Sequence, residues 1–135
     1  MLSKIGAVLK TAFAAVATAA NYLLGGFDAS VITLFVFIVL DYVTGIISAA
    51  HRGELSSKTG LFGILRKAAI VACVIIAVML DRLLGTEQVF KMMFCYFMIA
   101  NEGLSVLENA GEMGVPLPKK LVNALKQLRG ENDDE

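Results

Sequence analysis

The stretch VITLFVFIVLDYVTGIISAA, residues 31–50, decides the class of fold. At about 1.5 Å of rise per residue, a helix of this length crosses a hydrocarbon layer of roughly 30 Å. Twelve of its residues are Val, Ile, Leu or Phe. At roughly −0.3 to −0.6 kcal/mol each, they outweigh the roughly +3 kcal/mol cost of Asp41 near mid-membrane. The segment is therefore predicted to insert as a transmembrane helix despite its acid.

Three more stretches approach the same length, on either side of the first. They cover residues 5–24, 61–84 and 89–107, and the links between them carry Gly, Asp, Ser or charged residues. No sustained alternation of polar and apolar residues occurs, which argues against strands. With 57% hydrophobic and 18% charged residues, the chain is too apolar for a small soluble domain. We predict an all-α integral membrane protein with four hydrophobic helices.

The segment 5–24 differs from the others because seven of its residues are Ala and Lys10 interrupts it. Small residues let helices approach closely, so an Ala-rich helix suits packing against protein better than contact with lipid. Two alternatives stay open for this segment. It could be a signal peptide, with Ala17 and Ala19 at a cleavage site, or an amphipathic helix lying at the membrane interface.

The residue inventory argues against an enzyme. The chain has two Cys, one His, two Pro and no Trp, too few for most metal sites, flavin sites or nucleophilic triads. Cys73 and Cys95 lie inside apolar runs and are interpreted as small core residues. Twelve basic and twelve acidic residues give no net charge, so nucleic acid is not expected as a partner. We expect no catalytic residue, no metal and no cofactor.

The basic residues predict the orientation, because positive flanks are retained on the cytoplasmic side. With the amino terminus inside, only Arg82 and Lys91 fall on the outer side. The other ten basic residues are then cytoplasmic: Lys4, Lys10, Arg52, Lys58, Arg66, Lys67, Lys119, Lys120, Lys126 and Arg129. Both termini are therefore predicted to face the cytoplasm of a bacterial cell, with the chain crossing the cytoplasmic membrane several times.

The carboxyl-terminal part divides from the rest at about residue 110. Residues 1–110 are predicted to form the membrane helix bundle, and 111–135 a cytoplasmic linker, an amphipathic helix beginning at Pro118 and an acidic tail over 131–135. Leu residues share one face of this helix, and the membrane surface is the expected contact of its basic residues: Lys119, Lys120, Lys126 and Arg129. Docking of the helix on its own protein is the alternative.

Several ionisable or polar groups fall in the inner half of the predicted membrane region: Asp41, Arg66, Lys67, Asn101 and Glu102. Two acids and two bases sum to zero, so they can neutralise one another between helices. We predict Asp41 with Arg66 or Lys67 as the principal pair and Glu102 as the second acid. The alternative is that the two bases extend to the headgroups while Glu102 is already at water level.

The third segment is short between its charges. Residues 68–80 span only about 20 Å before Asp81 and Arg82 are reached. Either Asp81 and Arg82 lie at the outer interface, with Lys67 drawn inward, or the membrane is locally thinned. Such a helix favours protein or water beside it, as self-assembly would provide.

Small and hydroxylated residues mark expected helix contacts. Thr44 with Ser48, and Gly45 with Ala49, are spaced at i and i+4 beside Asp41, which allows close helix approach. Gly60 and Gly63, at the start of the third segment, are assigned to the same kind of packing.

The order of the motifs resembles a known family. The motifs are DYVTG at 41–45, SSKTGLFGILRK at 56–67, NEGLSVLEN at 101–109 and GVPLP at 114–118. Together they resemble the toxin secretion/phage lysis holin family, small membrane proteins of phages and prophages of Gram-positive bacteria. The resemblance covers about residues 31–128. It implies a homo-oligomer in the cytoplasmic membrane that opens lesions for an endolysin or a toxin, cargo for which no specific binding site is needed.

Two other classes remain as alternatives. In a small ion channel or proton-coupled transporter, Asp41 or Glu102 would titrate or bind substrate. In a membrane anchor, the segment 118–129 would recruit a cytoplasmic partner. The absence of an inverted repeat argues against a transporter. Substitution of Asp41 distinguishes an anchor from a holin, because an anchor would keep its function after that substitution.

Overall fold

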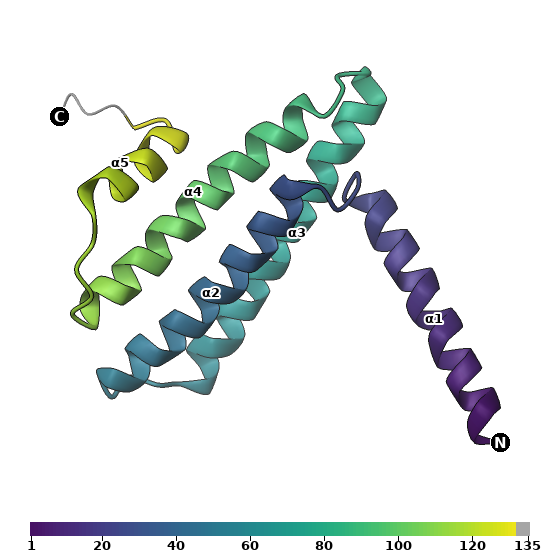
Figure 1. Ribbon diagram of the computed structural model, residues 1–135, viewed down its shortest axis with the longest axis horizontal. Helices are drawn as coiled ribbons and strands as arrows, with labels where there is room; N and C mark the ends of the chain where they lie inside the picture. Colours follow the sequence, from purple (N-terminus) through teal and green to yellow (C-terminus); the bar gives the residue numbers. More distant parts are fainter. Residues whose placement is uncertain (132–135) are drawn as a thin grey trace.

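The computed structural model describes residues 1–131, and this part of the chain is helical throughout apart from its turns. Four long helices precede a short one (Figure 1). Their bounds are α1 Leu2–Leu23, α2 Ala29–His51, α3 Ser57–Leu84, α4 Val89–Glu112 and α5 Lys119–Leu128. The predicted all-α architecture is confirmed. Residues 132–135, most of the predicted acidic tail, lie outside the described part.

The four long helices are each long and apolar enough to cross a membrane. The predicted segments differ from them mainly at their ends. α2 and α3 begin earlier than expected, and α4 continues five residues beyond 107, to Glu112. This extension is polar, and it continues because none of its residues breaks a helix before Gly114, whose φ is 86°.

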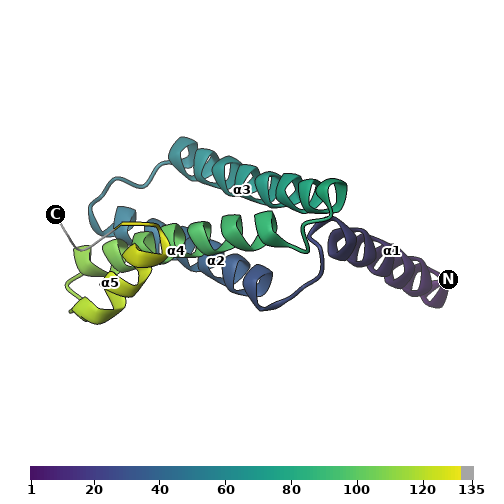
Figure 2. The same ribbon diagram turned by 90° about the horizontal axis from the view of Figure 1, so that it is seen from above.

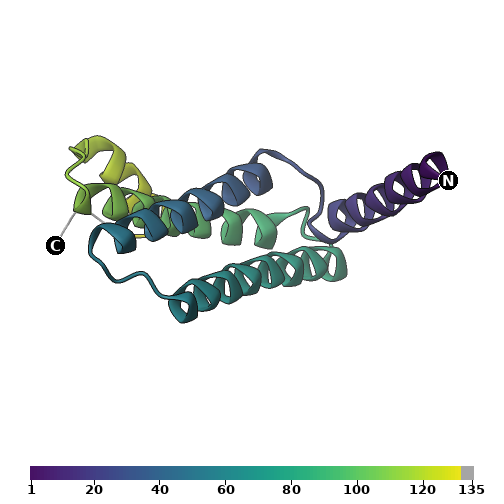
Figure 3. The same ribbon diagram turned by 90° about the horizontal axis from the view of Figure 1, so that it is seen from below.

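Helices α2, α3 and α4 form a bundle in which α2 and α4 are parallel and α3 is antiparallel to both (Figures 1 and 3). Asp28, just before α2, contacts Lys91 in the first turn of α4, while Ser48 and Glu112 meet at the other ends. The largest buried cluster between them is apolar. Its buried residues are Leu24, Val31, Leu34, Ile38, Ile70, Val74, Val78, Cys95, Met98 and Ile99.

Helix α1 diverges from this bundle. It meets α3 near the α1–α2 turn and then projects away, so that the amino terminus lies far from the other helices (Figures 1 and 2). No residue of α1 is buried, although Val8, Phe13 and Val16 are large and apolar. α1 is therefore a long apolar helix that contacts the bundle only near its carboxyl end, among residues 1–131.

Helix α5 folds back along α4 (Figure 1). A Cβ atom at Gly103 would lie 3.2 Å from Leu125 of α5 and 3.0 Å from Phe37 of α2, so only glycine allows this close approach. Pro118 lies at the N-cap and the helix begins one residue later than predicted, at Lys119. The amphipathic helix thus docks on its own protein, the alternative left open by its sequence.

Candidate functional site

The inner charge cluster consists of Asp41, Lys67 and Glu102, one residue from each helix of the bundle. The Lys67 ammonium forms ion pairs with both carboxylates. The side chains of Asp41 and Lys67 are each 13% exposed and that of Glu102 is 1% exposed. The structure therefore brings three of the predicted charged residues together, away from water.

Asn109 completes the surroundings of Asp41. It lies seven residues after Glu102, two turns along the same face of α4, and its side-chain amide donates to the Asp41 carboxylate at 3.3 Å and to the Thr44 hydroxyl at 3.0 Å. Asp41 thus accepts hydrogen bonds from two helices. With both acids ionised, the inner charge cluster carries one uncompensated negative charge.

Arg66 and Asn101 take other positions. Arg66 is exposed and makes no ion pair within the described residues, although it lies beside Lys67 in the sequence. Asn101 is half-buried and accepts a hydrogen bond of 3.5 Å from Arg129 of α5. Of the other basic residues of α5, Lys119, Lys120 and Lys126 are exposed.

A cleft of about 280 Å³ opens between α2 and α3, and we call it the α2–α3 cleft. Small residues predicted for helix packing line it, including Gly45, Gly60 and Gly63, and Asp41 and Lys67 also reach it. The Tyr42 hydroxyl donates to the Gly60 carbonyl at 3.3 Å, which ties the two helices together across it. The cleft connects the inner charge cluster with the surface of the bundle.

A second polar contact joins α2 and α4 near their carboxyl ends. The Glu112 carboxylate accepts from the Ser48 hydroxyl and from the Arg52 guanidinium. Arg52 also pairs with Glu54 at 2.9 Å. Ser48, predicted as a packing residue, therefore serves as a hydrogen-bond donor between helices.

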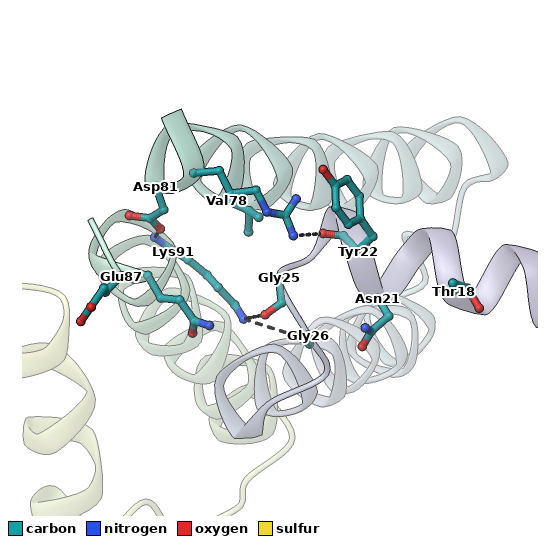
Figure 4. Close-up of a pocket in the computed structure, with 11 residues that line it drawn as sticks. Thr18, Asn21, Tyr22, Gly25, Gly26, Val78, Asp81, Glu87 and Lys91 are labelled. Atoms are coloured by element: carbon teal, nitrogen blue, oxygen red, sulfur yellow. Dashed lines mark hydrogen bonds between the residues drawn. The ribbon is translucent and has the colours of Figure 1, made fainter. Parts of the chain in front are cut away.

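What we call the outer charge cluster consists of Asp28, Asp81 and Lys91, at the end of the bundle where the α1–α2 and α3–α4 turns meet. Figure 4 shows Asp81 and Lys91 there, beside Gly25 and Gly26. Lys91 is fully buried, and its ammonium donates to the Gly25 carbonyl at 3.0 Å and pairs with Asp28 at 2.6 Å. Asp81 is also buried and accepts from the backbone N–H groups of Phe90 and Lys91 at 3.0 and 2.9 Å. Asp81 thus caps the start of α4.

Two details tie α1 to this cluster. Gly25 has φ 69°, and a Cβ atom there would lie 3.2 Å from Val78, so glycine lets the turn approach the bundle. The Arg82 guanidinium lies 4.0 Å from the centre of the Tyr22 ring and donates to the Tyr22 carbonyl. Arg82 therefore holds the end of α1 against α3.

Burial raises the pKa of Asp28, but hydrogen bonds from Lys91, Ser30 and the Val31 N–H and the nearby Lys91 charge outweigh this, so the net pKa lies below its usual 3.8. Asp28 is the N-cap of α2. It therefore stays ionised at neutral pH and links α2 to α4.

The sequence reasoning missed the outer charge cluster. Lys91 was predicted only to lie on the outer side, although Asp28, directly before an apolar segment, is a recognisable N-cap signal. Asn109 was also not predicted as a hydrogen-bond partner of Asp41. Its position seven residues after Glu102, on the same face of the helix, was the signal in the sequence. Among residues 1–131, no group of three His, Cys, Asp or Glu residues is placed to hold a metal ion.

Comparison with known proteins places the chain in context. Residues 18–130 match the model of the bacteriophage holin family. A probable holin of Bacillus phage phi105 is 33% identical over 102 residues, which cover 76% of each chain. An uncharacterized 14.9 kDa protein in the nagH 3′ region of Clostridium perfringens is 46% identical over 121 residues, 89% of this chain and 92% of that protein. No solved structure matches significantly.

Proposed function

The chain belongs to the bacteriophage holin family, and from this membership we propose that it oligomerises in the bacterial cytoplasmic membrane and opens lesions that release an endolysin or a toxin. Its action requires no catalytic group, metal or cofactor. The released protein is cargo and needs no specific binding site on this chain.

The observation that carries this proposal is the inner charge cluster between three apolar helices. Ionisable groups in hydrocarbon are costly unless they face one another, other protein or water. Lys67 joins Asp41 and Glu102 within one copy, and one negative charge remains when both acids are ionised. Assembly of several copies, or a water-filled lesion, lowers the cost of that charge. The cluster thus favours self-association over a lone monomer in lipid.

The proposed orientation places both termini in the cytoplasm. α1, α2, α3 and α4 each cross the membrane, so the outer charge cluster lies at the outer interface and the Arg52–Glu112 contact at the inner one. Ten of the twelve basic residues then lie on the inner side, as the distribution of positive charge favours.

Induced expression in a bacterium tests the function. Membrane potential and the escape of a cytoplasmic muralytic enzyme are followed together over time. We expect abrupt depolarisation that coincides with escape of the enzyme. Expression to the same level of a chain that lacks residues 31–84 is the matched control and is expected to leave both readouts at the level of uninduced cells.

A small channel or proton-coupled transporter is the second candidate. It is favoured by the α2–α3 cleft, which leads from the bundle surface to Asp41. Depolarisation without escape of the enzyme would support it over a large lesion. No depolarisation at all would contradict a lesion and an ion channel, and would favour a membrane anchor or a transporter.

A further inference from the structure

With both carboxylates ionised, the inner charge cluster is one cation short. Asp41 and Glu102 share a single ammonium, that of Lys67. Arg66 reaches the mouth of the α2–α3 cleft, but it is exposed and forms no ion pair among residues 1–131. A buried site with an excess carboxylate attracts a further positive group, and a lipid hydrocarbon chain cannot supply one.

Helix α1 carries an unpaired cation at the matching depth. Lys10 is exposed and has no ion-pair partner in the described part of the chain. It precedes Leu23, the outer end of α1, by 13 residues, or about 20 Å along the helix. Asp41 follows Ala29, the outer end of α2, by 12 residues, or about 18 Å. The two opposite charges therefore lie at similar distances from the outer ends of their helices.

α1 diverges from the bundle (Figures 1 and 3), and Lys10 forms no ion pair with Asp41 of the same copy. The contact that neutralises both charges therefore requires another molecule. Ala7 and Ala14 lie three and four residues from Lys10, on the same face of α1, and their small side chains allow a close approach. Gly45 and Ala49 give the α2 side of the cleft similarly small walls, while Gly60 and Gly63 on the α3 side face Tyr42.

We propose that the α2–α3 cleft receives helix α1 of a second copy of this chain, with Lys10 of that copy beside Asp41. The inference rests on the proposed assembly and names its interface. A cleft of 280 Å³ holds the side chain of Lys10, while the Ala-rich face of α1 lies across its opening. The interface buries an apolar helix that has no buried residue in the single copy.

Disulfide crosslinking between copies tests the proposal. Ala7 lies 16 residues before Leu23, the outer end of α1, and Gly45 lies 16 residues after Ala29, the outer end of α2. Each is therefore about 24 Å from the outer end of its own helix. Ala7→Cys and Gly45→Cys are placed in separate, differently tagged chains that are co-expressed in membranes. Exposed Cys73 is replaced by Ala in both chains, and buried Cys95 is kept. Mild oxidation is expected to give a heterodimer carrying both tags.

Ala68 provides the matched control, because it precedes Leu84 by the same 16 residues but is exposed outside the cleft. The pair Ala7→Cys with Ala68→Cys is expected to crosslink at least fivefold less. In the Gly45 pair, Lys10→Gln is expected to lower the yield by a similar factor, and Lys10→Arg to restore it. Equal yields for the two pairs, or a yield indifferent to Lys10→Gln, would overturn the proposal.

The depolarisation assay separates this interface from the function itself. Depolarisation and enzyme escape in a chain that fails the crosslinking test would overturn the interface and leave the lesion-forming role in place. Crosslinking through Gly45 without depolarisation would support the interface and contradict that role. Gly45→Cys is tolerated by the fold, since a Cβ atom there meets only the Asn109 side chain, at 3.7 Å.

Discussion

Lys67 holds two carboxylates from two other helices, so its ammonium links all three helices of the bundle. The outer charge cluster has a corresponding residue in Lys91, which is fully buried and reaches carbonyls of the α1–α2 turn as well as Asp28. Each lysine joins parts of the chain that are distant in sequence. Substitutions at these residues therefore test the packing of whole helices.

Lys67→Met is expected to leave Asp41 and Glu102 facing each other without a cation. Breaking a buried ion pair by removing one partner costs about 3–5 kcal/mol. The variant should unfold at a lower temperature in detergent and accumulate less in membranes. Arg66→Met is the control, because Arg66 is exposed and makes no ion pair within residues 1–131. Equal stability of the two variants would show that Lys67 has no such role.

Asp28→Asn is expected to remove a pH-dependent contribution to stability. Because the pKa of Asp28 is lowered on folding, its contribution is fully present above the ordinary pKa of 3.8 and is lost as the pH falls through the folded value. The unfolding temperatures of wild type and variant in detergent should therefore differ most near neutral pH and converge below about pH 3.8. Asn retains a good N-cap, so the comparison isolates the charge. A difference that is constant with pH would contradict this account.

At the scale of elements, hydropathy predicted the number and type of the helices, because about 20 apolar residues in a row have few other structures available. It did not predict their directions. The divergence of α1 depends on the turn at Gly25 and on the Arg82–Tyr22 contact, which join residues far apart in sequence. The pairing of Asp41 with Lys67 rather than Arg66 depends on which of two neighbouring side chains faces the bundle. Charge counting alone left that choice open.

Gly103→Leu is expected to release α5 from α4. A side chain at position 103 would meet Phe37 and Leu125 within 3.2 Å, and such overpacking costs about 1–3 kcal/mol. Trypsin added to the cytoplasmic face of inverted vesicles should then cleave after Lys119, Lys120 and Lys126 several times faster than in wild type. Gly6→Leu is the control, since nothing lies within 4 Å of a Cβ atom there. Unchanged cleavage in Gly103→Leu would mean that α5 does not depend on this contact.

At the scale of the whole molecule, the two charge clusters lie at different depths of one apolar bundle, the outer one where α2 and α4 begin and the inner one part-way along them. The outer cluster fixes the turns, and the inner cluster lies about 20 Å along α2 and α4 from them. Long apolar faces of α2 and α3 remain exposed between and beyond them, including Val39, Ile47, Leu65 and Ile76. These faces suit lipid or a neighbouring helix, whereas water would not solvate them well.

The orientation makes a prediction for the entire chain. Thr86→Cys, in the α3–α4 turn, should react with a membrane-impermeant thiol reagent added to intact cells. Ser3→Cys should react only in inverted vesicles, because the amino terminus is placed inside. Cys73→Ala in both variants removes the exposed native thiol. Labelling of Ser3→Cys in intact cells would contradict the proposed four crossings, and with them the membrane-spanning role of α1.

The divergence of α1 also determines how an assembly built through it would grow. A copy that inserts α1 into one neighbour and receives α1 from another forms a head-to-tail contact, in which the two surfaces differ. Such contacts close into a ring only when the rotation between successive copies permits, and otherwise extend as an open polymer. Growth then has no intrinsic end point. The number of copies in the membrane would set the length of the polymer, and the slow step would be the first few additions.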